Sequence, residues 1–273
     1  MKHNPGIGAT QELSLRVSVA TLVRVIFKHP VNDEWMLALE RRATLLQGEN
    51  GHFVAIKAQP FGGALRLLNT NALEERIGDF HFDSEQSRSE QDFRVFIRPS
   101  AWETILQFCL QHFRQIDDPV LEYEPTRELS EEFADTLQID LRPDQYSCKP
   151  VGMIVENTPS PTENVYTRGS LTARLYRIFE ARILDPSLAL AMLTNSASET
   201  NQHVERRAFA DFRNGGPGWY NAVLTLPLKL ISARYSAISP RARNQPISFQ
   251  NHQLDETVAA VLENITVPKY QKL

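Results

Sequence analysis

The chain has 273 residues, of which 42% are hydrophobic, so it is long enough to bury a substantial core. Its formal net charge is −4 at pH 7, and lysine and arginine form no basic run. This balance excludes the electrostatic footprint of a protein that binds a nucleic-acid backbone. Two cysteines are too few for a disulfide framework or a thiolate zinc site.

The sequence contains no stretch that is typical of a signal peptide or of a membrane-spanning helix. We therefore expect a cytoplasmic protein without a membrane partner. The same reasoning leaves the oligomeric state open.

Strand patterns dominate the first sixty residues, after a Pro- and Gly-containing flexible tail over residues 1–10. Strands are expected at 13–27, 35–42 and 52–58, with a polar turn after the first and a polar loop over 45–51. The third strand leads directly into the glycine pair Gly62 and Gly63. By itself this pair is typical of a plain turn after a strand.

Residues 69–92 are polar and predict an irregular segment, followed by a strand over 93–98. Ser100 and Glu103 have the spacing of a capping box that opens a helix. Further elements are expected beyond residue 150: a strand at 151–155, a turn-rich loop at 156–165, a segment of mixed periodicity at 171–184, two helices within 186–212, a helical segment at 219–238 that Pro227 bounds or kinks, and a short helix at 255–265.

The most informative stretch runs from Pro125, which suits the first position of a helix, to Leu137. In a helix its acidic side chains, at i, i+3, i+4 and i+7, form one stripe: Glu128, Glu131, Glu132 and Asp135. The apolar side chains of Leu129, Phe133 and Leu137 form a second stripe. An amphipathic helix with one charged face is therefore expected.

Like charges at this spacing repel by about 0.2–0.5 kcal/mol per pair. A divalent cation would relieve the repulsion, since Mg²⁺ takes oxygen ligands from one or two carboxylates together with substrate phosphate. A solvated acidic face with no ligand is the other interpretation.

The order of residues from Arg127 to Glu132, Arg-Glu-Leu-Ser-Glu-Glu, resembles the second half of the Nudix box. The family pattern is Gly, five residues, Glu, seven residues, and then Arg-Glu-aliphatic-any-Glu-Glu-any-Gly-aliphatic. In this chain Ala134 stands at the later glycine position and Asp135 at the aliphatic one. Pro119 and Phe113 stand where the upstream glutamate and glycine belong. We interpret the pattern as a box split by an insertion, with its glycine pair at Gly62 and Gly63.

The resemblance implies an α/β fold, a Nudix-like α/β/α sandwich around a mixed sheet, and favours a strand over 171–184. The domain would span residues 11–185, with the insertion at about 69–120. Residues 186–273 would form a mainly helical extension packed on the same domain. In layout, the insertion and the extension resemble Nudix domains of the SMODS-associated group, which lie beside nucleotide second-messenger synthases in bacterial defence loci.

The resemblance also implies roles for individual residues. Glu128, Glu131 and Glu132 would bind Mg²⁺ or Mn²⁺, and Arg127 would orient a neighbouring glutamate. The candidates for that glutamate are Glu74, Glu75, Glu122 and Glu124.

Catalytic roles fall on Glu131, Glu132 and the loop residue Glu163, with Glu156 as a second loop candidate. Gly62 and Gly63 would approach phosphate. Trp219 and Tyr220 are candidates for stacking on a base, with packing in the core as the alternative.

Three functions follow from these expectations. The first is metal-dependent hydrolysis of a phosphoanhydride in a nucleoside diphosphate linked to another group. The second is a Nudix-like sensor or effector domain that binds a nucleotide-type ligand without cutting it. The third is an α/β scaffold with no ligand.

Overall fold

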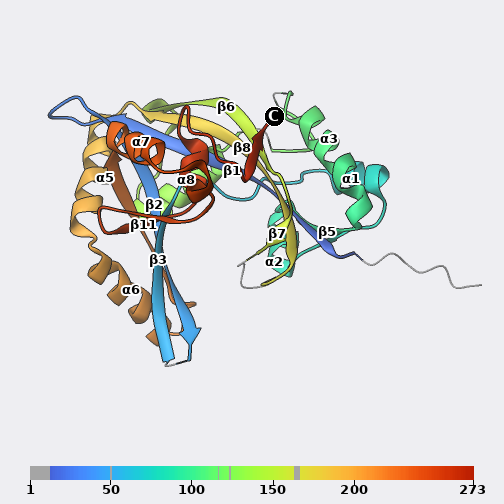
Figure 1. Cartoon of the computed structure of the whole chain (residues 1–273), viewed down its shortest axis with the longest axis horizontal. Helices are drawn as coiled ribbons and strands as arrows, with labels where there is room; N and C mark the ends of the chain where they lie inside the picture. The colour runs from blue at the N-terminus through green and yellow to red at the C-terminus, as the bar shows by residue number, and fades with distance from the viewer. Residues whose placement is uncertain (1–12, 50, 116, 123, 163–166) are drawn as a thin grey trace, which may run out of the picture. The chain divides into compact units, whose positions relative to one another are not determined.

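The computed structural model describes residues 13–49, 51–115, 117–122, 124–162 and 167–273 (Figure 1). Contacts divide the chain into a smaller unit and a larger unit. The smaller unit contains residues 1–19, 64–123 and 158–175, and the larger unit contains residues 20–63, 124–157 and 176–273. Among the described residues, no helix is both long and apolar enough to cross a membrane. The expected tail over residues 1–10 lies outside the described residues.

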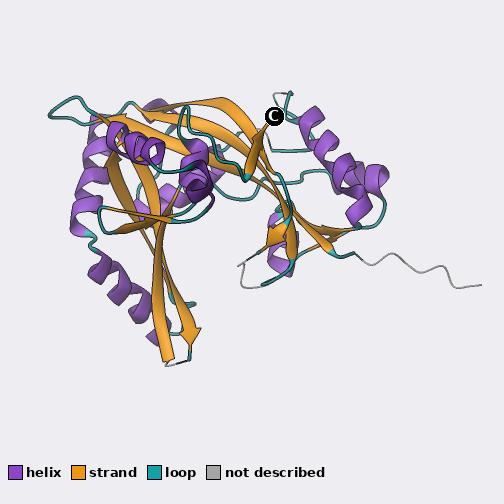
Figure 2. Cartoon of the chain, viewed as in Figure 1, coloured by secondary structure: helices purple, strands orange, loops and turns teal. Residues whose placement is uncertain are grey.

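The larger unit is built on a mixed sheet (Figure 2). The strand order is β10-β11-β3-β2-β1-β8-β6-β12, and β9 pairs with β2 off this path. The strands are β1 (Leu15–Lys28), β2 (Trp35–Gly48), β3 (Gly51–Gln59), β6 (Tyr146–Glu156), β8 (Leu171–Ile183), β9 (Trp219–Pro227), β10 (Ile247–Phe249), β11 (His252–Leu254) and β12 (Tyr270–Lys272). β11 is parallel to β3, whereas β2 is antiparallel to each of its three partners.

Strand β2 changes its partner along one edge. Its residues 35–38 pair with β1 and its residues 40–48 pair with β3, while β9 runs along the other edge from 36 to 44. After β3 the chain crosses to β1, where Phe61 forms a bridge with Val23. The sheet therefore forks at Glu40, the first residue of β2 that pairs with β3.

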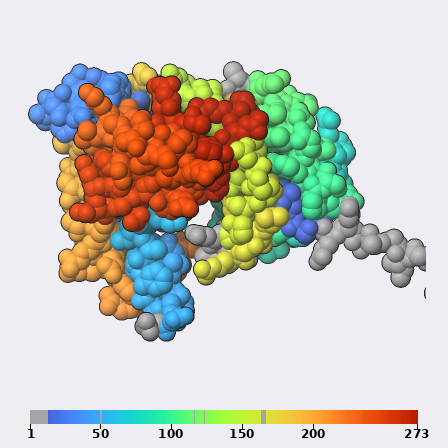
Figure 3. Space-filling view, viewed as in Figure 1, coloured from blue at the N-terminus to red at the C-terminus, as the bar shows by residue number. Residues whose placement is uncertain are grey.

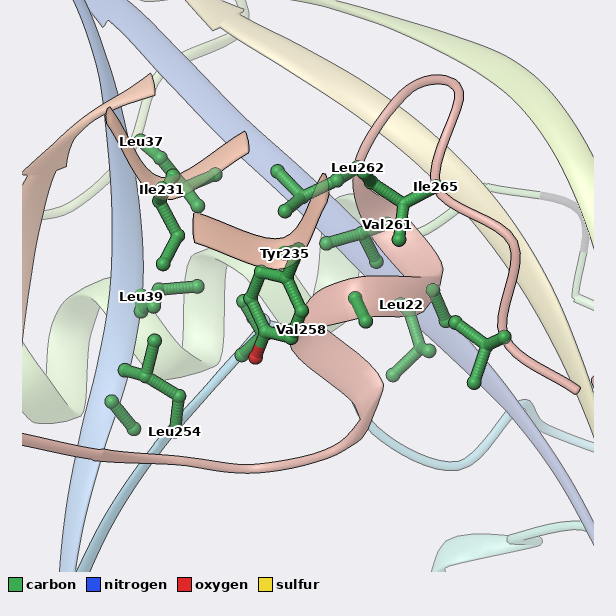
Figure 4. Packing of buried hydrophobic residues seen from close by; sticks show 14 of the residues in the cluster. Leu22, Leu37, Leu39, Ile231, Tyr235, Leu254, Val258, Val261, Leu262 and Ile265 are labelled. Carbon is green, nitrogen blue, oxygen red and sulfur yellow. The ribbon is translucent and has the colours of Figure 1, made fainter. Parts of the chain in front are cut away.

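Helices cover both faces of this sheet. They are α4 (Thr126–Leu137), α5 (Pro186–Ser198), α6 (Asn201–Arg213), α7 (Leu228–Ala237) and α8 (Thr257–Val261). On one face, Met36 and Ala38 of β2 pack in a cluster with residues of α4 and α5. On the other face, Leu37 and Leu39 pack against α7 and α8 (Figure 4). The alternation of side chains along a strand explains why neighbouring residues of β2 serve two cores.

The smaller unit contains α1 (Thr70–Ile77), β4 (His81–Phe82), α2 (Glu85–Glu90), β5 (Arg94–Ile97), α3 (Trp102–His112) and β7 (Ser160–Pro161). β5 pairs with β4 and with the first residues of β1, and β7 pairs with the first residues of β8. The segment 64–123 follows the glycine pair in sequence and precedes the acidic helix, and it contains residues 69–120, where an insertion was expected.

The structure confirms the α/β class, the first three strands, the acidic helix, the strand over 171–184 and the two helices that follow it. The expected loop over 45–51 is wrong, because β2 continues to Gly48 and pairs with β3 from Gly51. The segment 69–92 is not irregular, since it forms α1, β4 and α2. The predicted capping box at Ser100 and Glu103 is wrong, because Ser100 lies within a 3₁₀ turn over Pro99–Ala101 and α3 has no side-chain cap at its N-terminus.

The helical prediction over 219–238 is wrong for its first half. Residues 219–227 form β9, which pairs with β2 over its whole length, and only 228–237 are helical. The branched and aromatic residues of this segment suit a strand, and Pro227 marks the boundary between the two elements. The extension after residue 186 therefore supplies a strand of the central sheet as well as helices.

Phe133 anchors α4 to the sheet, because its ring is fully buried and its centroid lies 5.3 Å from that of Phe61. We expect Phe133→Ala to lower the free energy of unfolding by about 3–5 kcal/mol, the usual cost of a cavity of this size. The exposed Asp135 on the same helix is the control, and Asp135→Ala should change stability by no more than about 0.5 kcal/mol. Urea denaturation measures both, and equal midpoints would contradict this packing.

Candidate active site

The bend formed by Gly62 and Gly63, called the glycine bend, is hydrogen-bonded to β1. The Thr21 amide donates to the Gly63 carbonyl at 2.9 Å, and the Val23 amide donates to the Phe61 carbonyl at 2.7 Å. Gly62 has a φ of 129°, which side chains disfavour, and a Cβ at this position would overlap the Thr21 carbonyl oxygen. The bend therefore requires glycine at residue 62 for backbone reasons alone.

The bend lies directly against the acidic helix. The Gly62 amide donates a hydrogen bond of 2.7 Å to Oε2 of Glu132, across 70 residues of sequence. A Cβ at Gly63 would overlap Oε2 of Glu128. The structure thus brings together four predicted site residues: Gly62, Gly63, Glu128 and Glu132. All four belong to the larger unit.

Two further residues of this cluster, Glu40 and Arg42 of β2, were missed in the sequence. Glu40 is fully buried, and its carboxylate accepts a hydrogen bond of 2.9 Å from Nε2 of Gln59 and lies 3.1 Å from the Arg42 guanidinium. Burial acts to lower the pKa of Arg42, but Glu40, Glu132 and Glu128 outweigh it and raise that pKa. One sequence signal could have identified Glu40: it follows Met36 and Ala38 at two-residue spacing, which places a charged side chain on the buried face of the strand.

The environment of Glu132 disfavours its ionised form. Burial and then the charges of Glu40 and Glu128 raise its pKa well above the ordinary value, although the Gly62 amide and Arg42 act in the opposite direction. Glu40, Glu128 and Glu132 therefore lie near the Arg42 guanidinium, and Glu128 also pairs with Arg127 at 2.6 Å. A further positive charge would favour their ionised forms.

Arg127 links the remaining two glutamates of the motif. Its guanidinium lies 2.6 Å from Glu128 and 2.9 Å from Glu131, one turn further along the helix. Glu131 is 55% exposed, so it lies at the rim of the cluster rather than against the bend. Arg127 thus pairs with two carboxylates of its own helix.

The other candidates lie elsewhere. Glu163 is outside the described residues. Glu156 is buried on β6 in an ion pair with Lys269, at 3.0 Å. The four glutamates considered as partners of Arg127 are distributed over both units: Glu74, Glu75 and Glu122 in the smaller unit, and Glu124, which accepts a hydrogen bond from Thr126, in the larger one.

Across the part of the chain that the structure describes, no group of three or more His, Cys, Asp or Glu side chains is arranged to hold a metal ion. The Gly62 amide engages Glu132, and Arg127 engages Glu128 and Glu131. Mg²⁺ needs only one or two carboxylates, because water and phosphate complete its octahedron. The donors are all hard oxygens, which fits Mg²⁺ or Mn²⁺ in chemistry without a preformed cage.

Comparison of the chain with profiles of protein families, with curated proteins and with solved structures found no match. The function is therefore inferred from the residues of the site.

The two glycines should respond differently to alanine. We expect Gly62→Ala to lower the free energy of unfolding by about 1–3 kcal/mol, since it combines an unfavourable φ with a backbone overlap. Gly63→Ala meets only the end of a flexible side chain and should cost less. Gly152→Ala, with open space around the new methyl group, is the control for both. Urea denaturation measures all three, and a larger loss for Gly63→Ala than for Gly62→Ala would contradict the geometry of the bend.

The raised pKa of Glu132 predicts a particular pH dependence of the metal-free protein. Between the ordinary glutamate pKa, about 4.3, and the raised value, the folded state binds more protons than the unfolded state, so stability falls as pH rises. Glu132→Gln removes this term. We expect the variant to be more stable than the wild type at pH 8 and to lose that advantage near pH 4. Parallel pH profiles in urea denaturation would contradict the assignment.

Proposed function

We propose that the larger unit is a Nudix-like α/β/α sandwich and that it hydrolyses a phosphoanhydride in a nucleoside diphosphate linked to another group, with Mg²⁺ or Mn²⁺. The observation that carries this proposal is the contact of Gly62 and Gly63 with the carboxylates of Glu132 and Glu128. It supports a box split by residues 64–123, because the two halves that the motif requires lie side by side in space.

Glu128 and Glu132 are the proposed ligands of the cation, and Glu131 is the third. The bound cation would polarise a phosphoryl oxygen and neutralise charge on the leaving phosphate. Glu131 has to release Arg127 to take part, since the two now lie 2.9 Å apart. Glu132 and Glu131 are also the described candidates for removing the proton of the attacking water.

Glu40 and Arg42 position the other groups in this proposal. Gln59 and Arg42 hold the Glu40 carboxylate inside the fork of the sheet. Arg42 is 46% exposed, so its guanidinium can also donate to a phosphate oxygen. Its positive charge remains when the substrate leaves, which limits the repulsion among the carboxylates.

A specific observation supports the second candidate function, a sensor or effector domain that binds a nucleotide without cutting it. Two of the three motif glutamates are tied to Arg127, and no three-residue metal group is present among the described residues. A domain that only binds a nucleotide has no need to free these carboxylates. In that case the SMODS-associated Nudix group is the appropriate family comparison.

Phosphate release from a panel of nucleoside diphosphate derivatives with Mg²⁺ tests the enzyme. We expect turnover by the wild type and a loss of at least about 100-fold in Glu132→Gln and in Glu128→Gln, as for removal of one group that stabilises the transition state. Asp135→Asn is the matched control, since it neutralises an exposed carboxylate of the same helix.

Calorimetric titration of the same compounds separates the alternatives. Binding without turnover would replace the hydrolase by the sensor. Absence of both turnover and binding would leave a scaffold with a solvated acidic face.

A further inference from the structure

A strip of side chains continues the candidate site along the sheet. Residues directly opposite each other in antiparallel strands project from the same face. From Arg42 outwards, the face of β3, β2 and β9 that carries Glu40 presents three rows: Lys57, Arg42 and Asn221; then Ala55, Thr44 and Trp219; then Phe53 and Leu46. We call these eight residues the strip, and all of them lie in the larger unit.

The two faces of these strands differ in cover. On the opposite face, α6 packs Val204 and Ala208 against Ala43 and Ala222, and Tyr220 packs beside them. On the strip, Trp219 is 48% exposed and Phe53 is 50% exposed. The outer part of the β2–β3 hairpin lies at the surface in Figure 3. The strip thus offers two large aromatic side chains on a rigid, three-stranded support.

Charge is concentrated at the end of the strip next to the carboxylates. The Arg42 side chain is 46% exposed and pairs with Glu40, and the Lys57 side chain is 39% exposed and lies 4.0 Å from Asp255. In the same row, on β9, Oδ1 of Asn221 is buried and accepts no hydrogen bond from the described residues. The strip therefore runs from a row with two cations and an unsatisfied acceptor to rows with aromatic rings.

The spacing matches one class of ligand. Trp219 lies one strand across and two residues along from Arg42. The usual strand spacing and rise per residue place their Cα atoms about 8 Å apart. This is the span between the phosphates and the base of a nucleotide. An apolar protein partner would match the rings but would leave the cations facing an apolar surface, so the charge pattern favours an anionic aromatic ligand.

We propose that the strip binds the nucleoside part of the substrate, with the base stacked on Trp219, the phosphates at Arg42 and Lys57, and a ribose or base donor on Asn221. Phe53, in the outermost row, would contact the group beyond the base. This inference rests on the proposed function, since it assigns the ligand of the same site. Stacking tolerates every base, so the strip predicts a nucleotide class rather than one base.

The test uses the full chain with Mg²⁺ and two kinds of probe, the four common nucleoside diphosphates and inorganic pyrophosphate. We expect Trp219→Ala to weaken binding of the nucleoside diphosphates by about 5–150-fold and to leave pyrophosphate binding unchanged, as calorimetry measures it. Trp219→Phe should restore most of the affinity. Phe212→Ala removes an exposed ring from α6 on the opposite side of the strands and should change neither.

Each contrary result has its own meaning. Equal affinity of the wild type for pyrophosphate and for the nucleoside diphosphates overturns the strip but leaves the phosphate site intact. Unchanged nucleotide binding in Trp219→Ala, with a change in sedimentation from dimer to monomer, makes the strip a contact between copies and overturns the proposal. Failure of every probe to bind the wild type overturns both the strip and the proposed function.

Discussion

The structure of the candidate site depends on the contact between a bend without side chains and a helix with too many negative charges. The Gly62 amide donates to Glu132, and the absence of a Cβ at Gly63 leaves the space that Glu128 occupies. A Cβ at Gly62 would overlap the Thr21 carbonyl of β1, and a Cβ at Gly63 would displace the Glu128 carboxylate. Because the bend is bonded to β1, the carboxylates are fixed relative to the whole sheet.

The opposite side of α4 explains why the helix stays in this position despite the repulsion. Leu129 and Phe133 are buried in the core that includes Phe61, the residue before the bend. Apolar burial thus supports the helix on one side, while the other side holds Glu128 and Glu132 against Arg42 and the bend. The fork in the sheet gives space for this arrangement. The pairing of β2 with β1 ends at Ala38 and its pairing with β3 begins at buried Glu40, so Glu40 lies where β1 and β3 separate. The buried apolar face of α4 makes this crowding of carboxylates tolerable.

Local patterns in the sequence were sufficient for α4 and for the first three strands, and the resemblance to the Nudix box predicted that the glycine bend lies near the acidic helix. Those features depend on spacing within a few residues or on one family motif. Glu40 and Arg42 were missed because their role depends on which strands flank β2, and a single sequence does not give the partners of a strand. The same reason accounts for β9, whose apolar clusters suit a helix or a strand until β2 provides its hydrogen bonds. Arg127 pairs with Glu128 and Glu131, which are close to it in sequence. The difference between buried Glu132 and its exposed neighbour Glu131 depends on how α4 packs, which a single sequence does not give.

Anomalous diffraction from crystals soaked in Mn²⁺ tests the central claim most directly, because it locates the cation without assuming a substrate. The account predicts an anomalous peak at coordination distance from the carboxylates of Glu128 and Glu132, on the side of α4 that faces Gly62 and Gly63. Absence of a peak there, with Arg127 still paired to Glu128 and Glu131 at saturating Mn²⁺, would contradict it.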